Sequence, residues 1–204
     1  MRVSLGLSSL SALAILLPIA AVHAQTPVFA SRYTDLKKDC DTPAWFLADK
    51  RTWEARHPGK EYPEPPPESL DCKPVGAWRA TIDWSAVSMV LRVVPLSPGA
   101  KADAALQVGE RLGEGRSAGA LEWRLADGKP FAVIFRTQAW RENPKWTSDG
   151  KAPQYIVSAE KIVVRGLSGF TALNLEIPAN DTQANIKARA AADAAFGTQS
   201  DVHP

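Results

Sequence analysis

The residues best suited to chemistry lie in one stretch, residues 121–137, where Glu122, Arg124 and Arg136 stand among apolar side chains. Glu122 is flanked by bulky apolar residues. A glycosidase needs only two acids flanking the bond that it cleaves, so Glu122 is a candidate acid. The alternative is that Glu122 is a surface charge paired with Arg124 or Arg136. The three residues therefore form either a ligand-facing patch or a solvated face.

A second candidate site combines two tryptophans with basic residues. Trp140, Arg141 and Trp146 lie in residues 138–153, an otherwise polar segment that we expect to be a long loop. Exposed Trp and Arg are favoured anchors of binding surfaces, and the faces of Trp rings suit sugars or partner side chains. The alternative is that both rings fold back and pin the loop.

Motifs for other chemistry are missing from the sequence. Beyond residue 24 the only histidines are His57 and His203, and neither has a Ser or Cys nucleophile beside it. The sequence has no Gly-rich phosphate loop, no H-E-x-x-H and no calcium-loop pattern. We therefore expect no metal and no cofactor, and we name no catalytic residue.

Residues 1–24 have the pattern of a secretory signal peptide. Arg2 supplies the positive start, an apolar core follows, and Val22-His23-Ala24 is a small-residue cleavage site. The alternative, a transmembrane anchor, is disfavoured by Pro18 and by the shortness of the apolar run. We expect cleavage after Ala24 and a periplasmic or secreted bacterial protein.

The charge balance after residue 24 limits the possible partners. Of the 24 Lys and Arg residues only Arg2 precedes residue 25, so 23 basic residues face 22 acidic ones. Such a balance provides no basic field for nucleic acid and no polybasic segment for anionic lipid. No second long apolar run follows, so we expect no stable membrane insertion. The remaining partner is an envelope ligand or a protein.

The two cysteines predict the organisation of residues 25–75. Cys40 and Cys72 are the chain's only cysteines, and in an oxidising compartment they most simply form a disulfide. The bond would close a loop of about 33 residues and contribute roughly 3–4 kcal/mol in the chain-entropy model. Within this loop we expect a helix capped by Thr42 and running to Arg56, with Trp45, Phe46 and Trp53 reaching the core, followed by an extended proline-rich stretch.

Residues 121–137 predict a hairpin whose register follows from its apolar pattern. Apolar and polar residues alternate over 121–125, as in a half-buried strand, whereas 131–135 is apolar on both sides. Asp127-Gly128 favours a two-residue turn, but that turn would pair apolar residues with polar ones. A three-residue loop, Asp127–Lys129, pairs Leu125 with Phe131, Trp123 with Val133 and Leu121 with Phe135, so we predict this register.

The same patterns recur over residues 76–197, which we expect to form one domain. Strands are predicted at 77–84 and 87–94 with a turn at Ser85-Ala86, and at 155–164 and 170–177. Residues 96–119 are expected to be a connection with a weak helical patch at 102–112. Asn180 or Asp181 caps a C-terminal helix with a small-residue inner face, an Arg189–Asp193 pair on its polar side and Gly197 as its end.

These elements predict a mainly β protein of the α+β class. About six antiparallel strands would form a curled sheet, a small barrel or a sandwich, covered by the C-terminal helix and joined to the disulfide-closed N-terminal segment. Residues 198–204 are expected to be a loose tail.

Five fragments carry a resemblance: Tyr33-Thr-Asp-Leu followed by Cys40; Cys72-x-x-x-Gly76-x-Trp78; Glu122-Trp-Arg124; Pro130-Phe-Ala-Val-Ile-Phe-Arg136; and Ala184-Asn-x-x-Ala188-Arg-x-x-Ala192-Asp193. With these fragments the chain resembles a family of secreted Gram-negative bacterial proteins that has no assigned activity. The resemblance implies export and a single domain, and it implies no catalytic residue. Arg116-Ser-Ala-Gly119 is also similar to the Ser-Gly loop of periplasmic lysozyme inhibitors, although Leu121 stands where those proteins carry an aromatic residue.

The function expected from the sequence is that of a non-enzymatic binding or interaction protein. Its ligand would be an envelope component or a protein, bound by the Trp140–Trp146 segment or by the polar side of the hairpin with Glu122, Arg124 and Arg136. The alternatives are a cell-wall glycan hydrolase that uses Glu122 as an acid and a protein similar to lysozyme inhibitors.

Overall fold

The computed structural model describes residues 26–64, 67–84, 88–97, 105–112 and 119–200. The predicted signal peptide, the predicted turn at Ser85-Ala86 and the end of the tail from residue 201 lie outside these ranges. Among the described residues, no helix combines the length and apolar content that crossing a bilayer requires.

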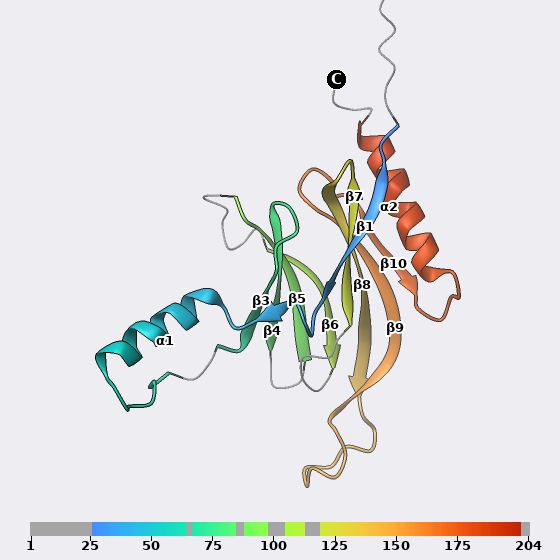
Figure 1. Cartoon of the computed structure of the whole chain (residues 1–204). Coiled ribbons are helices and arrows are strands. Elements are labelled where there is room, and N and C mark those ends of the chain that lie inside the picture. The colour runs from blue at the N-terminus through green and yellow to red at the C-terminus, as the bar shows by residue number, and fades with distance from the viewer. Residues whose placement is uncertain (1–25, 65–66, 85–87, 98–104, 113–118, 201–204) are drawn as a thin grey trace, which may run out of the picture.

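The described strands form two antiparallel sheets that face each other without closing into a barrel (Figure 1). Sheet A contains, in spatial order, β1 (Phe29–Asp35), β7 (Ala120–Ala126), β8 (Lys129–Glu142), β9 (Tyr155–Gly166) and β10 (Asn174–Pro178). Sheet B contains β2 (Cys40–Asp41), β3 (Ser69–Cys72), β4 (Trp78–Trp84), β5 (Ser88–Pro95) and β6 (Leu106–Leu112). The mainly β prediction is confirmed, with ten described strands instead of about six.

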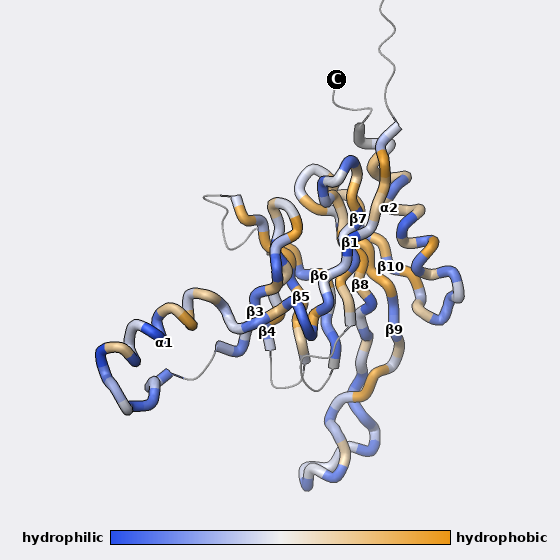
Figure 2. The backbone as a smooth tube through the Cα atoms, in the orientation of Figure 1, coloured by the Kyte–Doolittle hydropathy of each residue, from blue (hydrophilic) through white to orange (hydrophobic). Residues whose placement is uncertain are grey.

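The main core fills the space between the two sheets. Alternating residues of β4 turn inward, and Ala80 and Ile82 are fully buried with Trp78 and Trp84 packed beside them, which confirms their predicted common face. From sheet A the opposing side chain is Trp123, whose indole N–H donates to Thr34 Oγ1 at 2.8 Å. A buried ring can hold this position because its one polar group is satisfied. Figure 2 shows hydrophobic residues running along the strands of both sheets.

The central hairpin, β7–β8, contains a β-bulge, which reconciles the two-residue turn favoured by Asp127-Gly128 with the register favoured by the apolar pattern. Asp127 and Gly128 have φ values of 48° and 76°, the left-handed pair that a two-residue turn requires. Leu125 pairs with Pro130, yet Trp123 pairs with Val133, so the register shifts by one residue between them. The predicted Trp123–Val133 pair is confirmed, whereas the three-residue loop and the Leu125–Phe131 pair are wrong.

The bulge turns Phe131 to the opposite face of sheet A. There its ring lies 6.0 Å from Phe29, 5.4 Å from Phe170 and 4.9 Å from Phe196, between centroids. This group belongs to a second core, beneath the C-terminal helix, to which Ala132 and Ile134 also contribute. A bulge re-aims a side chain by adding one residue to one strand, and here it supplies an aromatic ring to the second core.

Helix α2 (Ala184–Ser200) covers the outer face of sheet A (Figure 1). Ala184, Ala188 and Ala192 are buried, which confirms the predicted small-residue face. Asp181 Oδ1 accepts a hydrogen bond from the Gln183 N–H at 2.8 Å, in the turn that precedes the helix and not within its first turn. The predicted end at Gly197 is wrong, because the helix continues to residue 200.

Helix α1 (Ala44–Arg56) projects away from both sheets (Figure 1). Its predicted existence is confirmed, but Thr42 does not cap it: Pro43 holds that position without a side-chain hydrogen bond. Phe46 packs against Tyr62, and Trp53 stacks on His57 and meets Tyr62 edge-on. The prediction that these aromatic residues reach the main core is therefore wrong. We call residues 42–64 the arm.

The predicted disulfide between Cys40 and Cys72 is confirmed at the base of the arm, with an S–S distance of 1.98 Å. The two residues are paired across β2 and β3, and both are buried in the main core. The bond therefore joins the two chain segments that lead into and out of the arm.

Strand β6 stands where a helical patch was expected at residues 102–112, of which 102–104 lie outside the described residues. Along β6 Val108 is buried between the sheets, and the strand pairs with β5. Its other side touches β8: Thr137 Oγ1 donates to the Glu110 carbonyl at 2.6 Å and accepts from the Glu110 N–H at 2.9 Å. Gly109 permits this approach, because an added Cβ would lie 2.7 Å from Thr137 Oγ1. β6 thus connects the two sheets along one edge.

Candidate functional site

Glu122 lies beneath α2 and is only 6% exposed. Its Oε1 accepts hydrogen bonds from Ser31 Oγ at 2.6 Å and from Arg189 Nε at 2.7 Å, and its Oε2 accepts from Arg189 Nη2 at 3.0 Å. The expected pairing with Arg124 or Arg136 is therefore wrong. Hydrogen bonding to Glu122 raises the pKa of Arg189 above its usual value, so the guanidinium keeps its charge.

Arg124 makes the second link between β7 and α2. Its Nε and Nη2 donate to the two carboxylate oxygens of Asp193 at 2.7 and 2.6 Å, and its Nη1 donates to Ser31 Oγ at 2.9 Å. Hydrogen bonding to Asp193 raises the pKa of Arg124. The predicted Arg189–Asp193 pair on the helix surface is wrong, because each residue instead binds the opposite charge on the strand.

These contacts form one network whose principal task is to hold α2 on sheet A. Ser31 joins the two ion pairs, and Tyr33 Oη accepts from Arg189 Nη2 at 2.9 Å at the network's edge. Both carboxylates, Glu122 and Asp193, are engaged through both of their oxygens by guanidinium groups. Glu122 also lines the pocket described next, but a glycosidase acid must direct a proton at its substrate, whereas both oxygens of this carboxylate accept hydrogen bonds.

A polar pocket of about 380 Å³ opens beside this network. We call it the arginine pocket, because Arg111 of β6, Arg136 of β8 and Arg189 of α2 all line it, together with Tyr33 and Asn185. Arg136 therefore lies near Glu122, as expected from the sequence, but in a separate set of contacts: its Nη1 is 3.5 Å from Glu160 Oε2.

The other candidate residues lie on the end of the β8–β9 hairpin, which extends beyond the rest of sheet A (Figure 1). β8 continues to Glu142, so the loop predicted to begin at residue 138 begins later. Trp140 is half-buried and meets Tyr155 edge-on, with ring centroids 5.4 Å apart, whereas Trp146 is 46% exposed. Arg141 is also exposed. Of the two rings, only that of Trp140 folds back.

The hairpin end is stabilised by hydrogen bonds within it. The Asn143 N–H donates to the Gln154 carbonyl at 2.8 Å, Asn143 Nδ2 donates to the Pro153 carbonyl at 2.8 Å, and the Trp146 N–H donates to the Asn143 carbonyl at 2.9 Å. Figure 2 shows that this end is mostly hydrophilic. Trp146 is thus a large, exposed apolar side chain on a hydrogen-bonded, mostly polar hairpin end.

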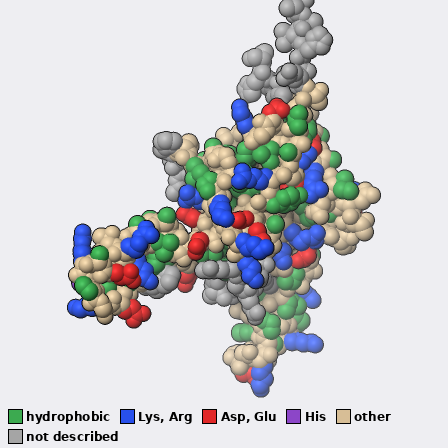
Figure 3. Space-filling view, viewed as in Figure 1, with side chains coloured by type: hydrophobic (Ala, Val, Ile, Leu, Met, Phe, Trp, Pro, Cys, Tyr) green, Lys and Arg blue, Asp and Glu red, His purple; other side chains and the backbone are tan. Residues whose placement is uncertain are grey.

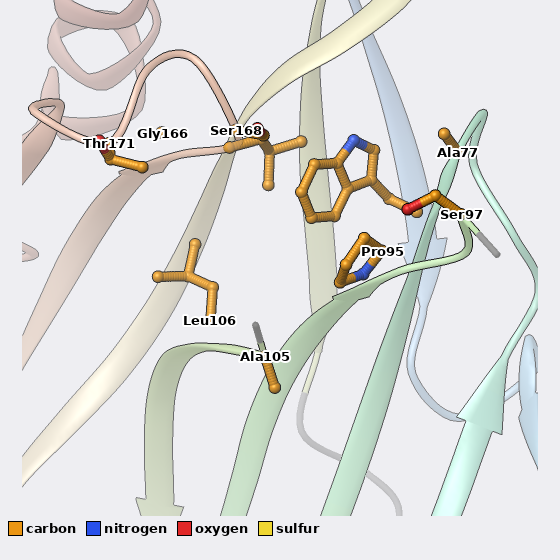
Figure 4. A pocket seen from close by; sticks show the side chains of 10 residues that line it. Ala77, Pro95, Ser97, Ala105, Leu106, Gly166, Ser168 and Thr171 are labelled. Carbon is orange, nitrogen blue, oxygen red and sulfur yellow. The ribbon is translucent and has the colours of Figure 1, made fainter. Parts of the chain in front are cut away.

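A larger pocket of about 520 Å³ lies between the sheets and the β9–β10 connection (Figure 4). Pro95, Leu106 and Leu167 give it a largely apolar lining. Ser97 and Ala105 also line it, and they stand on either side of residues 98–104, outside the described part of the chain. Because residues that are not described adjoin this pocket, we assign it no ligand.

Charges of both signs are interspersed over the face seen in Figure 3, in keeping with the near-neutral balance of the sequence. Among residues 26–64, 67–84, 88–97, 105–112 and 119–200, no group of three or more His, Cys, Asp or Glu side chains is arranged to hold a metal ion.

Sequence reasoning missed Tyr33, Arg111 and Arg189 as site residues. Arg111 was assigned to a connection, and no strand was predicted around Tyr33. Arg189 was placed on the solvent side of its helix. Their sequence separations range up to 156 residues, so only the pairing of β1 with β7 and the docking of β6 and α2 bring them together. Comparisons with protein-family models, curated proteins and solved structures found no match.

Proposed function

We propose that this chain is an exported, non-enzymatic binding protein that engages an envelope component or a protein partner through the end of its β8–β9 hairpin. Residues 1–24 would direct it to the periplasm or the medium, in agreement with the family resemblance carried by Glu122-Trp-Arg124 and the other fragments. The observation that carries the proposal is the exposed Trp146 on a hydrogen-bonded hairpin beyond the sheet.

The hydrogen-bonded hairpin end is preorganised for binding. Binding costs free energy whenever a loop or a side chain must be ordered, and a hairpin that is already hydrogen-bonded avoids much of that cost. Trp is the residue most enriched among the few that dominate binding energy, and its ring can stack on a sugar or enter a pocket. Arg141 and Lys145 beside it supply donors for the polar rim of such an interface.

The two alternative functions have less support. The hydrolase hypothesis needs Glu122 to deliver a proton, yet both oxygens of that carboxylate accept hydrogen bonds from Ser31 and Arg189. The lysozyme-inhibitor hypothesis rests on residues 116–119, and 116–118 lie outside the described residues. A binding protein requires neither a proton donor at Glu122 nor a loop at residues 116–119.

The test is a thermal-shift screen of the purified protein against peptidoglycan fragments, acidic and neutral sugars, and lysozymes. A ligand at about 100 times its dissociation constant should add roughly 2.7 kcal/mol of stability. For any hit, Trp146→Ala should weaken binding about 30-fold or more, since a central Trp typically contributes at least 2 kcal/mol. The melting temperature of the free protein should not change.

Trp45→Ala is the matched control, because Trp45 is also exposed but lies on the arm. It should leave the affinity within about twofold of the unchanged protein, since surface residues away from an interface contribute little. A hit whose affinity does not depend on Trp146 would contradict the proposal. A detected turnover that Glu122→Gln abolishes without unfolding the protein would instead establish the hydrolase.

A further inference from the structure

The arginine pocket contains more positive than negative charge. Three guanidinium groups line it, and the carboxylates that they contact are Glu122 and Glu160. Glu122 is fully used by Arg189 and Ser31. Arg111 and Arg136 must therefore share Glu160.

Glu160 makes only long ion pairs with the two arginines. Its oxygens lie 3.4 Å from Arg111 Nη2 and 3.5 Å from Arg136 Nη1, and it also accepts from Gln138 Nε2 at 3.3 Å. A well-matched pair of guanidinium and carboxylate has N···O distances of about 2.7–2.9 Å, as Arg124 has with Asp193. The two arginines of the pocket are thus only partly neutralised.

Two further side chains of the pocket have hydrogen-bond donors that meet no acceptor among the described residues. Tyr33 Oη already accepts from Arg189, so its own O–H is left to donate, and among the described residues it meets no acceptor. The side-chain amide of Asn185 likewise makes no hydrogen bond within the described part of the chain. Arg111 donates to the Arg136 carbonyl at 2.9 Å, which holds its guanidinium in place with further N–H groups to spare.

We propose that the arginine pocket binds an oxyanion, a carboxylate or phosphate group of a small ligand, between Arg111, Arg136 and the Tyr33 hydroxyl. An oxyanion would bring a negative charge to the two partly neutralised arginines and acceptor oxygens to the unused N–H and O–H donors. Guanidinium groups bind such groups through paired N–H donors, which a single ammonium cannot provide. Arg111 is 21% exposed and Arg136 42%, so the ligand enters from solvent into a partly desolvated site.

This site is independent of the proposed function, because the arginine pocket and the exposed end of the β8–β9 hairpin share no residue. Arg111 and Arg136 would recognise the charge of the ligand, while the Glu122–Arg189 pair continues to hold α2 on sheet A.

The experiment titrates the purified protein with sodium phosphate or sodium acetate at constant ionic strength, followed by NMR of the arginine side chains. Both probes carry the oxyanion, and their relative affinities show whether the pocket prefers phosphate or carboxylate. Arg136→Gln should weaken binding of the preferred anion about tenfold or more, since it removes a charged donor pair. Glu160→Gln should strengthen binding severalfold, because it releases both arginines.

Arg92→Gln is the matched control. Arg92 has a similar exposure, 45%, and pairs with Asp83 on sheet B, so its removal changes the net charge equally but leaves the pocket intact. We expect an affinity within about twofold of the unchanged protein, as for a remote exposed charge. The proposal is overturned if neither anion binds, if Arg136→Gln and Arg92→Gln weaken binding equally, or if Glu160→Gln does not strengthen it.

Discussion

The two helices of this protein stand in opposite relations to its sheets. α2 lies on sheet A, where buried alanines allow close contact and two ion pairs bind it to β7. α1 extends away from both sheets, and its one buried residue, Phe46, packs against Tyr62 of the same segment. α2 is therefore part of the folded body, whereas α1 belongs to an arm with an aromatic cluster of its own. Whether a segment forms a helix and whether that helix packs on a sheet therefore depend on different residues.

The largest expected effect comes from separating the arm from the body at its base. Replacing both Cys40 and Cys72 with alanine should lower the free energy of unfolding by about 3–4 kcal/mol, the value of a closed loop of this size in the chain-entropy model. Thermal and urea unfolding would measure it. A loss below about 1 kcal/mol would contradict this account, in which the bond stabilises the fold by restricting the unfolded chain.

The second largest effect is expected when an alanine is replaced with leucine in α2, and the same replacement in α1 serves for comparison. Ala188→Leu in α2 should destabilise the protein by about 1–3 kcal/mol, because a larger side chain does not fit between the helix and sheet A. Ala48→Leu in α1 is its matched control: Ala48 is exposed, so we expect a change within about 0.5 kcal/mol. Equal losses in the two variants would contradict the docking described for α2.

A third effect should be confined to the arm. Phe46→Ala removes the centre of the arm's aromatic cluster, so helical signal in circular dichroism should fall and proteolysis within residues 42–64 should accelerate. The midpoint of unfolding of the body should stay unchanged. A cooperative loss of the whole fold would show that α1 and the sheets form one unit.

The smallest effect is spectroscopic. Tyr62 donates to Asp49 at 2.6 Å, and this hydrogen bond raises the pKa of Tyr62 to about 12. The folded protein therefore favours the protonated phenol; this contribution is present below the unfolded pKa, near 10, and is lost as the pH rises through about 12. Ultraviolet titration should show Asp49→Asn returning the pKa toward about 10. An unchanged titration would place Tyr62 away from Asp49 in solution.

Much of the fold could be predicted because burial repeats with the period of each element. The alternation along β4 and the alanines of α2 were sufficient to predict their inner faces, and the two cysteines predicted their own bond. β6 was missed because its glycine and charged residues gave a weak pattern that only contact with β5 and Thr137 resolves. The bulge was missed because a two-residue turn and the Trp123–Val133 pair seemed incompatible, although one added residue, Phe131, reconciles them.

The candidate site was less predictable, because ion pairs carry no period. The pairing of Arg189 with Asp193 followed from their spacing in the sequence, yet in the structure Glu122 and Arg124 lie closer to them. A spacing of four residues is worth a few tenths of a kcal/mol at a surface, whereas a two-point contact with a partly buried partner is stronger. Which partner is available depends on how α2 lies on sheet A.

The position of the disulfide has a consequence for how this chain can change over evolutionary time. Its cysteines face each other across β2 and β3, so the arm leaves and re-enters the body at one point. The entropic cost of a longer loop grows only slowly with its length. Residues 42–64 can therefore be lengthened, shortened or exchanged for another segment while both sheets keep their pairing. The body is thus a scaffold with a replaceable module.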